Sequence, residues 1–174
     1  MLHIDFVSLK HVAYEYAKRG ARLALVTRRE DRLLVVANKA RKLGSPEVIV
    51  SCADVSKVEE CKRFVDEAVS HFGRLDYLVN NAGILQLRLF EDFSQLSDIA
   101  SVMASKAALI SFFETLRTEF GQDIGITIVN PGVIKSEMTQ GHYLSEIQAD
   151  WFPTETTEGC AKAILDSACN GDID

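Results

Sequence analysis

One unit recurs along this chain and limits the folds open to it more than any other feature. The unit is an amphipathic helix, a glycine that ends it, and a short run rich in β-branched residues. The spacing of apolar residues predicts helices over 9–19, 30–44, 56–73, 104–120 and 157–168, and strands over 21–27, 48–50, 75–79 and 124–129. Parallel strands need crossover connections, and helices must cover both faces of their sheet. The pattern therefore predicts an α/β fold with a doubly wound, mostly parallel sheet.

The helix over 56–73 has the most specific local pattern. Ser56 and Glu59 have the spacing of a capping box, in which each side chain bonds a free backbone N–H at the helix start. Gly73 is expected to end the helix. One face carries the apolar residues Val58, Cys61, Val65, Ala68 and Phe72.

The length and net charge of the chain limit the classes of protein to which it can belong. With 174 residues, 47% of them apolar, the chain can bury one core, and we expect a single domain over 1–174. The 19 Lys and Arg against 25 Asp and Glu give a net charge of −6, which opposes binding to nucleic acid. No apolar run reaches the length of about 18 residues that a membrane span needs. Because Asp5 lies where a signal peptide is basic, we expect a cytoplasmic chain without a membrane span.

The cysteines and histidines give no sign of a disulfide framework or a metal site. Cys52, Cys61, Cys160 and Cys169 form no C-x-x-C pair, and we expect them to be reduced structural thiols. The 4 histidines are scattered and offer no ligand cluster.

Ligands of doubly wound sheets bind beyond the carboxyl ends of the strands. In this chain the corresponding loops are 27–29, 53–55, 80–83 and 130–132. We therefore expect the functional residues there.

Three motifs in these regions resemble the short-chain dehydrogenase/reductase family. They are Asn80-Asn81-Ala82-Gly83 after a strand, Ala104-Ser105-Lys106 at a helix start, and Pro131-Gly132-Val133-Ile134 after the next strand, with Asp54-Val55 upstream. The segments 13–21, 112–117 and 158–164 are most similar to the plant hydroxysteroid dehydrogenases of seed oil bodies, the steroleosin branch. The resemblance implies a Rossmann-like dinucleotide-binding domain.

The resemblance also implies NADP as the cofactor. Arg28 and Arg29 follow the second strand of the family, where a guanidinium would pair with the 2′-phosphate of NADP. The alternative is a solvated start of the next helix. Asp54 and Val55 would flank the adenine, and the alternative for Asp54 is an ordinary turn acid.

The nicotinamide end of the site follows from the same resemblance. Asn80, Ala82 and Gly83 would present backbone to the cofactor, or else form a plain turn at a strand end. Pro131, Gly132 and Ile134 would line the nicotinamide, or else form a simple strand exit. Lys106, the remaining catalytic candidate, would contact the nicotinamide ribose and depress the pKa of a catalytic tyrosine, although exposed lysines in a first helical turn are common.

Two departures from the family pattern affect its chemistry. No glycine precedes Gly20, so the glycine-rich turn that holds the pyrophosphate is missing, although 1–7 offers a replacement strand.

The second departure concerns the catalytic residues. The family uses a tyrosine four residues before the lysine as general acid/base, and here that position is Val102. Only 22 residues lie between Gly83 and Lys106, too few for the family's crossover helix, strand and catalytic loop. We interpret this as a deletion joined near Met103 and Ala104 that removes the asparagine, serine and tyrosine.

Two functions remain open. The family implies an NADP-dependent oxidoreductase that interconverts an apolar alcohol and ketone such as a steroid, at a lipid droplet or membrane. The departures favour a catalytically inactive, truncated or spliced relative with an incomplete fold. Such a chain is expected to be marginally stable and to associate with itself through the helix over 104–120, whose apolar face lacks its packing partner.

Overall fold

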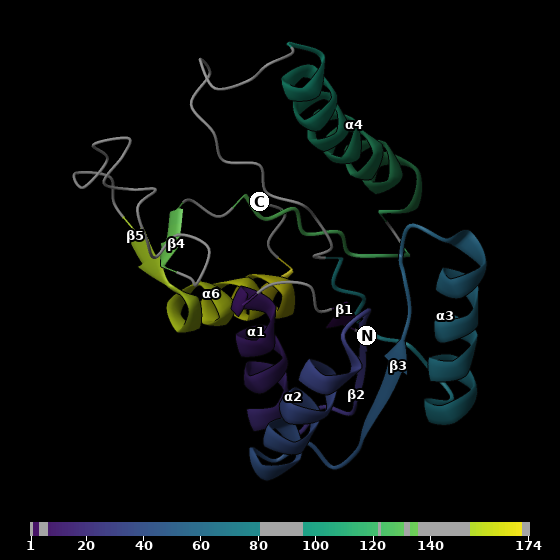
Figure 1. Cartoon of the computed structure of the whole chain (residues 1–174), viewed down its shortest axis with the longest axis vertical. Coiled ribbons are helices and arrows are strands. Elements are labelled where there is room, and N and C mark those ends of the chain that lie inside the picture. The colour runs from purple at the N-terminus through teal and green to yellow at the C-terminus, as the bar shows by residue number, and fades with distance from the viewer. Residues whose placement is uncertain are drawn as a thin grey trace. The chain divides into compact units, whose positions relative to one another are not determined.

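A computed structural model describes residues 2–3, 7–80, 96–121, 123–130, 133–135 and 154–171 of the chain. The chain divides into two compact units. The first comprises residues 1–83 and 156–162, and the second comprises residues 84–155 and 163–174. The first unit contains the parallel sheet and the helices that cover it (Figure 1).

The sheet of the first unit is parallel throughout its described strands. The strands β1 (Leu2–His3), β2 (Leu23–Thr27) and β3 (Val48–Cys52) lie in the order β1-β2-β3. In this register Leu25 pairs with Leu2 on one side and with Val50 on the other. All five residues of β2 are buried, because β2 has a strand on each side and helices over its faces.

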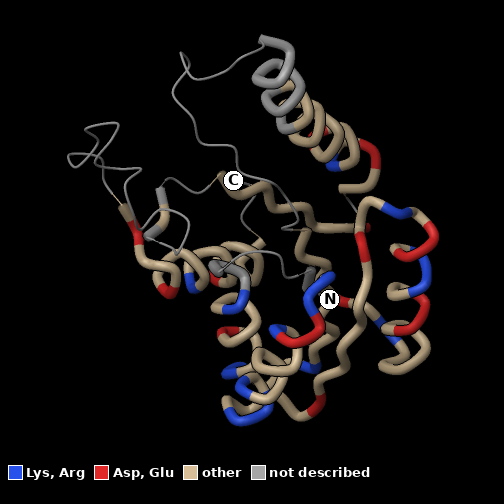
Figure 2. The backbone as a smooth tube through the Cα atoms, viewed as in Figure 1, with Lys and Arg blue, Asp and Glu red and all other residues tan. Residues whose placement is uncertain are grey.

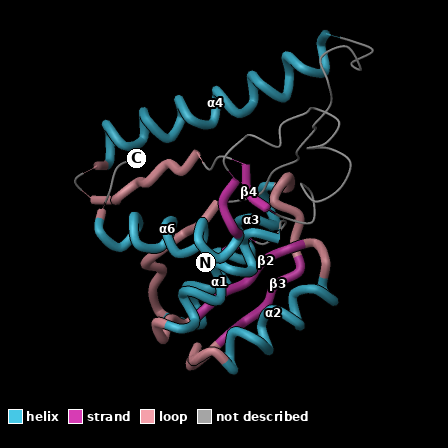
Figure 3. Tube along the Cα trace, turned by 90° about the vertical axis from the view of Figure 1, so that its left-hand side faces the viewer, coloured by secondary structure: helices cyan, strands magenta, loops and turns pink. Residues whose placement is uncertain are grey.

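Helices cover both faces of this sheet, as the alternating pattern predicts. In Figures 1 and 3, α1 (Val7–Lys18) and α2 (Glu30–Lys42) lie together on one side of the strands and α3 (Val58–Phe72) on the other. Left-handed glycines follow the ends of α1 and α3, at Gly20 with φ 75° and Gly73 with φ 79°. The predicted helix stops at Gly20 and Gly73 are confirmed.

The buried face of α3 is centred on Phe64 and Ala68. Phe64 forms a core cluster with Val26 of β2 and Ala53, and its neighbours in this cluster are the half-buried Val55, Cys61 and Val65. Val58, by contrast, is 78% exposed, so its predicted place on the apolar face is wrong. Full burial of side chains such as Val26 and Phe64 contributes about 1.5–3 kcal/mol each.

The predicted capping box at the start of α3 does not form. Lys57 is the N-cap residue, and no side chain accepts a hydrogen bond there. Instead, the Ser56 N–H and hydroxyl both donate to Asp54 Oδ1, at 3.0 and 2.8 Å. An aspartate two residues before a free N–H forms such a turn readily, and here it outcompetes the cap.

Two predicted strands are absent from the described structure. Residues 75–78 are irregular, Leu75, Tyr77 and Leu78 are 37–50% exposed, and Val79 makes only a single bridge. Residues 124–129 are irregular as well. A β-branched run becomes a strand only where a neighbouring strand supplies ladder hydrogen bonds.

The second unit contains the long helix α4 (Leu96–Phe120) and a sheet of two strands, β4 (Val133–Lys135) and β5 (Thr154–Thr156). The last residue of β5, Thr156, is assigned to the first unit. Helix α4 begins at Leu96 rather than at the predicted residue 104, and it passes without a break through Met103 and Ala104. Helix α6 (Thr157–Asn170) starts where the sequence predicts.

The described part of α4 exposes large apolar side chains. Leu109 and Phe120 are each 45% exposed and Phe112 is 56% exposed. Figure 2 shows charged residues along α2 and α3, whereas the described part of α4 carries few. Among the described helices, none has the length and apolar character to cross a membrane.

Candidate functional site

The loops after β2 and β3 run beside each other at the carboxyl edge of the sheet. The Ala53 N–H donates to the Thr27 carbonyl oxygen at 3.2 Å, and Cys52 Sγ lies 3.6 Å from the Arg28 carbonyl oxygen. The charge of Arg28 also acts on the Asp54 carboxyl. The structure thus brings together the predicted site residues Arg28, Asp54 and Val55.

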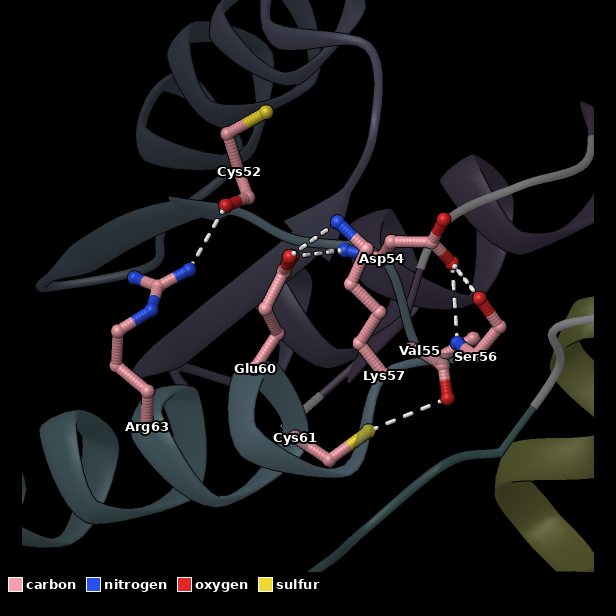
Figure 4. Close-up of polar contacts among 8 residues, drawn as sticks. All are labelled: Cys52, Asp54, Val55, Ser56, Lys57, Glu60, Cys61 and Arg63. Atoms are coloured by element: carbon pink, nitrogen blue, oxygen red, sulfur yellow. Dashed lines mark hydrogen bonds and ion pairs between the residues drawn. The ribbon is translucent and has the colours of Figure 1, made fainter.

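The Asp54 carboxylate is held by the loop itself. Both hydrogen bonds from Ser56 end on the same oxygen, Oδ1 (Figure 4). The Ser56 N–H, then the Ser56 hydroxyl and to a smaller degree the Arg28 charge lower the pKa of Asp54 from its ordinary value. The carboxylate is therefore ionised and fixed in orientation.

Side chains of α3 bind the backbone of this loop. Glu60 Oε2 accepts the Asp54 N–H at 2.7 Å, and Lys57 Nζ lies 3.0 Å from Glu60 Oε1 (Figure 4). The Cys61 thiol donates to the Val55 carbonyl oxygen at 3.3 Å, and Arg63 Nη2 donates to the Cys52 carbonyl oxygen at 3.0 Å. The Glu60 contact is not predicted from the sequence, because the capping-box spacing singles out Glu59.

Two polar atoms of the loop have no partner among the described residues. They are the Val55 N–H, a donor, and Asp54 Oδ2, an acceptor. They belong to adjacent residues in a loop whose other backbone donors are bonded. An adjacent donor and acceptor match the ring nitrogen and amino group on the edge of an adenine base.

Arg29 lies at the start of α2. Its N–H is 3.4 Å from Thr27 Oγ1, its backbone forms the N-cap, and its side chain is exposed. Glu30 and Asp31 follow in the first turn of α2, where acids stabilise the helix dipole. This position is compatible with both predicted roles, a phosphate contact and a solvated helix start.

The structure describes little of the predicted nicotinamide end. Asn80 is exposed and follows the single bridge of Val79. Ile134 lies on β4 and is half-buried. Lys106 lies within α4, but its side chain is outside the described part. Ala82, Gly83, Pro131 and Gly132 lie outside the described residues.

The sequence pattern of the short chain dehydrogenases matches residues 10–104 of this chain. This stretch includes β2, β3 and the loops just described. The chain belongs to the short-chain dehydrogenase family. The family match ends at Ala104, within α4.

Plant members of the short-chain dehydrogenase family are similar over most of the chain. The 11-beta-hydroxysteroid dehydrogenase-like 3 of Arabidopsis thaliana is 44% identical over 200 residues, covering 90% of this chain and 65% of the relative. The 11-beta-hydroxysteroid dehydrogenase A of Arachis hypogaea is 41% identical, covering 94% of this chain and 63% of the relative. This chain thus spans a little under two thirds of the length of these relatives.

Within the matched region, the Arabidopsis relative is longer than this chain. It spans 200 positions, whereas 90% of 174 residues is about 157. About 43 of the aligned positions therefore have no residue in this chain.

Solved short-chain dehydrogenase structures share the fold. An L-sorbose reductase from Gluconobacter frateurii, complexed with NADPH and L-sorbose, matches with a TM-score of 0.78 at 21% identity, covering 95% of this chain and 87% of its own. A mutant short-chain dehydrogenase/reductase from Serratia marcescens matches with a TM-score of 0.79 at 23% identity, covering 97% and 89%. The predicted α/β, Rossmann-like fold is confirmed, and the described residues contain three parallel strands of its sheet.

Proposed function

We propose that this chain is a short-chain dehydrogenase relative that keeps the adenine end of an NADP site and does not catalyse hydride transfer. The observation that carries the proposal is Val102, four residues before Lys106 in α4. By resemblance to the family, a tyrosine is needed at this position to exchange a proton with the substrate oxygen. An aliphatic side chain has no such proton, so the general acid/base step has no agent.

Three observations support an internal loss of residues as the cause. Helix α4 is continuous across Met103 and Ala104. The family match ends at Ala104. The aligned Arabidopsis relative has about 43 positions without a counterpart here, the size expected for a helix and strand with their loops.

The adenine end of the site fits the nucleotide better than the pyrophosphate end does. Val55 N–H and Asp54 Oδ2 offer the donor and acceptor that an adenine edge requires. Arg28 and Arg29 supply positive charge near a 2′-phosphate. No glycine lies between the end of β1 at His3 and the start of α1 at Val7, so close approach of the pyrophosphate to the backbone is hindered.

When bound, the nicotinamide of NADP would supply hydride chemistry between an alcohol and a ketone. In this chain Asp54 and Val55 would orient the adenine, and Arg28 and Arg29 would neutralise the 2′-phosphate. Lys106 would remain near the ribose, but it would have no tyrosine whose pKa it could depress.

The second candidate is an active NADP-dependent oxidoreductase acting on an apolar alcohol or ketone such as a steroid. It is favoured by relatives at 40–44% identity with names of 11-beta-hydroxysteroid dehydrogenases. A lipid-droplet location rests on the same resemblance. This candidate needs a proton donor other than the residue at position 102.

Binding of cofactor fragments tests the proposal. Isothermal titration calorimetry would compare NADP with adenosine 2′,5′-bisphosphate, which lacks the nicotinamide half. We expect the two affinities to agree within about threefold, because the nicotinamide half gains little binding energy here. An affinity for NADP more than about tenfold higher, a difference of 1.4 kcal/mol, would contradict the proposal.

A further inference from the structure

We infer that Glu60 is a positioning residue of the adenine-binding loop, which it shapes by accepting the N–H of Asp54. The inference rests on the proposed nucleotide binding and adds a residue that neither the family motifs nor the sequence pattern singles out. Glu60 would not touch the nucleotide. It would act through the backbone of Asp54 and Val55.

The backbone hydrogen bonds of residues 53–57 support this role for Glu60. The Ala53 N–H is bonded to Thr27, and the Ser56 and Lys57 N–H groups are bonded to the side chain and the carbonyl of Asp54. The Asp54 N–H has Glu60 as its partner. The Val55 N–H is then the one loop donor with no bond to the described part of the chain.

Glu60 is held in place from its other side as well. Lys57 Nζ lies 3.0 Å from Oε1, while Oε2 lies 2.7 Å from the Asp54 nitrogen. The Asp54 N–H, then Lys57, and to a smaller degree the Arg63 charge lower the pKa of Glu60 from its ordinary value. The carboxylate is therefore ionised and makes a charge-assisted bond to the loop.

The other two side chains of α3 that bond to this backbone, Cys61 and Arg63, donate to carbonyl oxygens. Cys61 binds the Val55 carbonyl and Arg63 the Cys52 carbonyl, so neither can replace Glu60 as an acceptor (Figure 4). Without Glu60, the Asp54 N–H loses its partner and competes with the Val55 N–H for the base. The binding edge would then lose its fixed geometry.

Three variants of the full chain separate this role from a general charge effect. Glu60→Leu removes the acceptor, and Glu60→Gln keeps an oxygen acceptor without the charge. Glu59→Leu is the matched control, because Glu59 is exposed on the same turn and has the same charge. We expect Glu60→Leu to weaken binding of adenosine 2′,5′-bisphosphate about tenfold, and Glu60→Gln and Glu59→Leu to stay within about threefold of the wild type.

The outcomes distinguish this inference from the proposed function. A wild-type chain that does not bind adenosine 2′,5′-bisphosphate would overturn the proposed function and the inference with it. Unchanged binding by Glu60→Leu, or equal losses in Glu60→Leu and either other variant, would overturn the inference alone. Hydrogen exchange on the wild type is a test that needs no variant to fold. Protection of the Asp54 amide is expected, and its free exchange would overturn the inference.

Discussion

Val102 lies one helical turn before Lys106 in the unbroken helix α4. Positions four residues apart are neighbours on one helix face, which is the relation that the family requires between its tyrosine and lysine. The chain keeps this spacing and the lysine, but the residue that would exchange the proton is aliphatic. The proposed loss of catalysis therefore rests on the chemistry of the side chain at position 102, since the helix itself is continuous.

Restoring the phenol should not restore activity. In Val102→Tyr, the new hydroxyl would still lack a serine partner and a held nicotinamide, and orientation supplies about 7–11 kcal/mol of an enzymatic rate enhancement. We expect no NADPH oxidation above buffer with steroid ketones, measured by the absorbance of the reduced cofactor. Turnover by this variant would show that the other catalytic parts are present.

The two arginines after β2 should select the phosphorylated cofactor. We expect the wild type to bind adenosine 2′,5′-bisphosphate about tenfold more tightly than adenosine 5′-monophosphate, because each guanidinium can make charge-assisted bonds to the 2′-phosphate. The double variant Arg28→Ala, Arg29→Ala should lose this preference in calorimetry. Arg22→Ala, at the other end of β2, is the charge control. A preference that survives the double variant would remove the 2′-phosphate assignment.

The turn at Asp54 should contribute to stability in a pH-dependent way. The Ser56 N–H and hydroxyl hold the pKa of Asp54 below its ordinary value of 3.8. Because the folded state favours the ionised form, the contribution is complete above pH 3.8 and is lost as the pH falls through the lower folded pKa. Ser56→Ala removes one of the two bonds, so its acid unfolding should begin at a higher pH.

Circular dichroism during acid titration measures this shift. Ser70→Ala, also an exposed serine but on α3, is the matched control and should titrate like the wild type. Equal acid midpoints for Ser56→Ala and the wild type would show that the Ser56 hydroxyl contributes nothing to the turn.

Most elements of the first unit are predicted correctly from the sequence, because the patterns that specify them lie within each element. The apolar run within 21–27 predicts β2, which the structure places at Leu23–Thr27, and glycines predict the ends of α1 and α3. The rule that ligands bind at the carboxyl ends of parallel strands predicts that Arg28 and Asp54 lie near each other, and in the structure the charge of Arg28 acts on the Asp54 carboxyl.

The errors arise where the outcome depends on a partner distant in sequence. The runs over 75–79 and 124–129 have strand composition, but composition does not report whether a neighbouring strand is present to pair with. Glu60 was missed for a related reason. Its bond to Asp54 depends on how the loop returns to α3, whereas the sequence spacing favours a local cap by Glu59.

The exposed face of α4 should drive self-association. Phe112 is 56% exposed, and exposed apolar patches promote association between copies. Phe112→Ser should lower the fraction of dimer and larger species in sedimentation velocity without lowering the melting temperature. Leu34→Ser on α2, 48% exposed, is the matched control and should leave association unchanged. Equal effects of the two variants would exclude α4 as the specific surface.

The most direct test of the proposed loss of catalysis is a steady-state assay of the purified full chain with NADPH and a panel of steroid ketones and simple aldehydes. A plant 11-beta-hydroxysteroid dehydrogenase under the same conditions serves as the positive control. We predict that NADPH oxidation by this chain equals the buffer rate at every enzyme concentration. Turnover in the usual range of about 1–10³ per second, proportional to the amount of protein, would contradict the central claim.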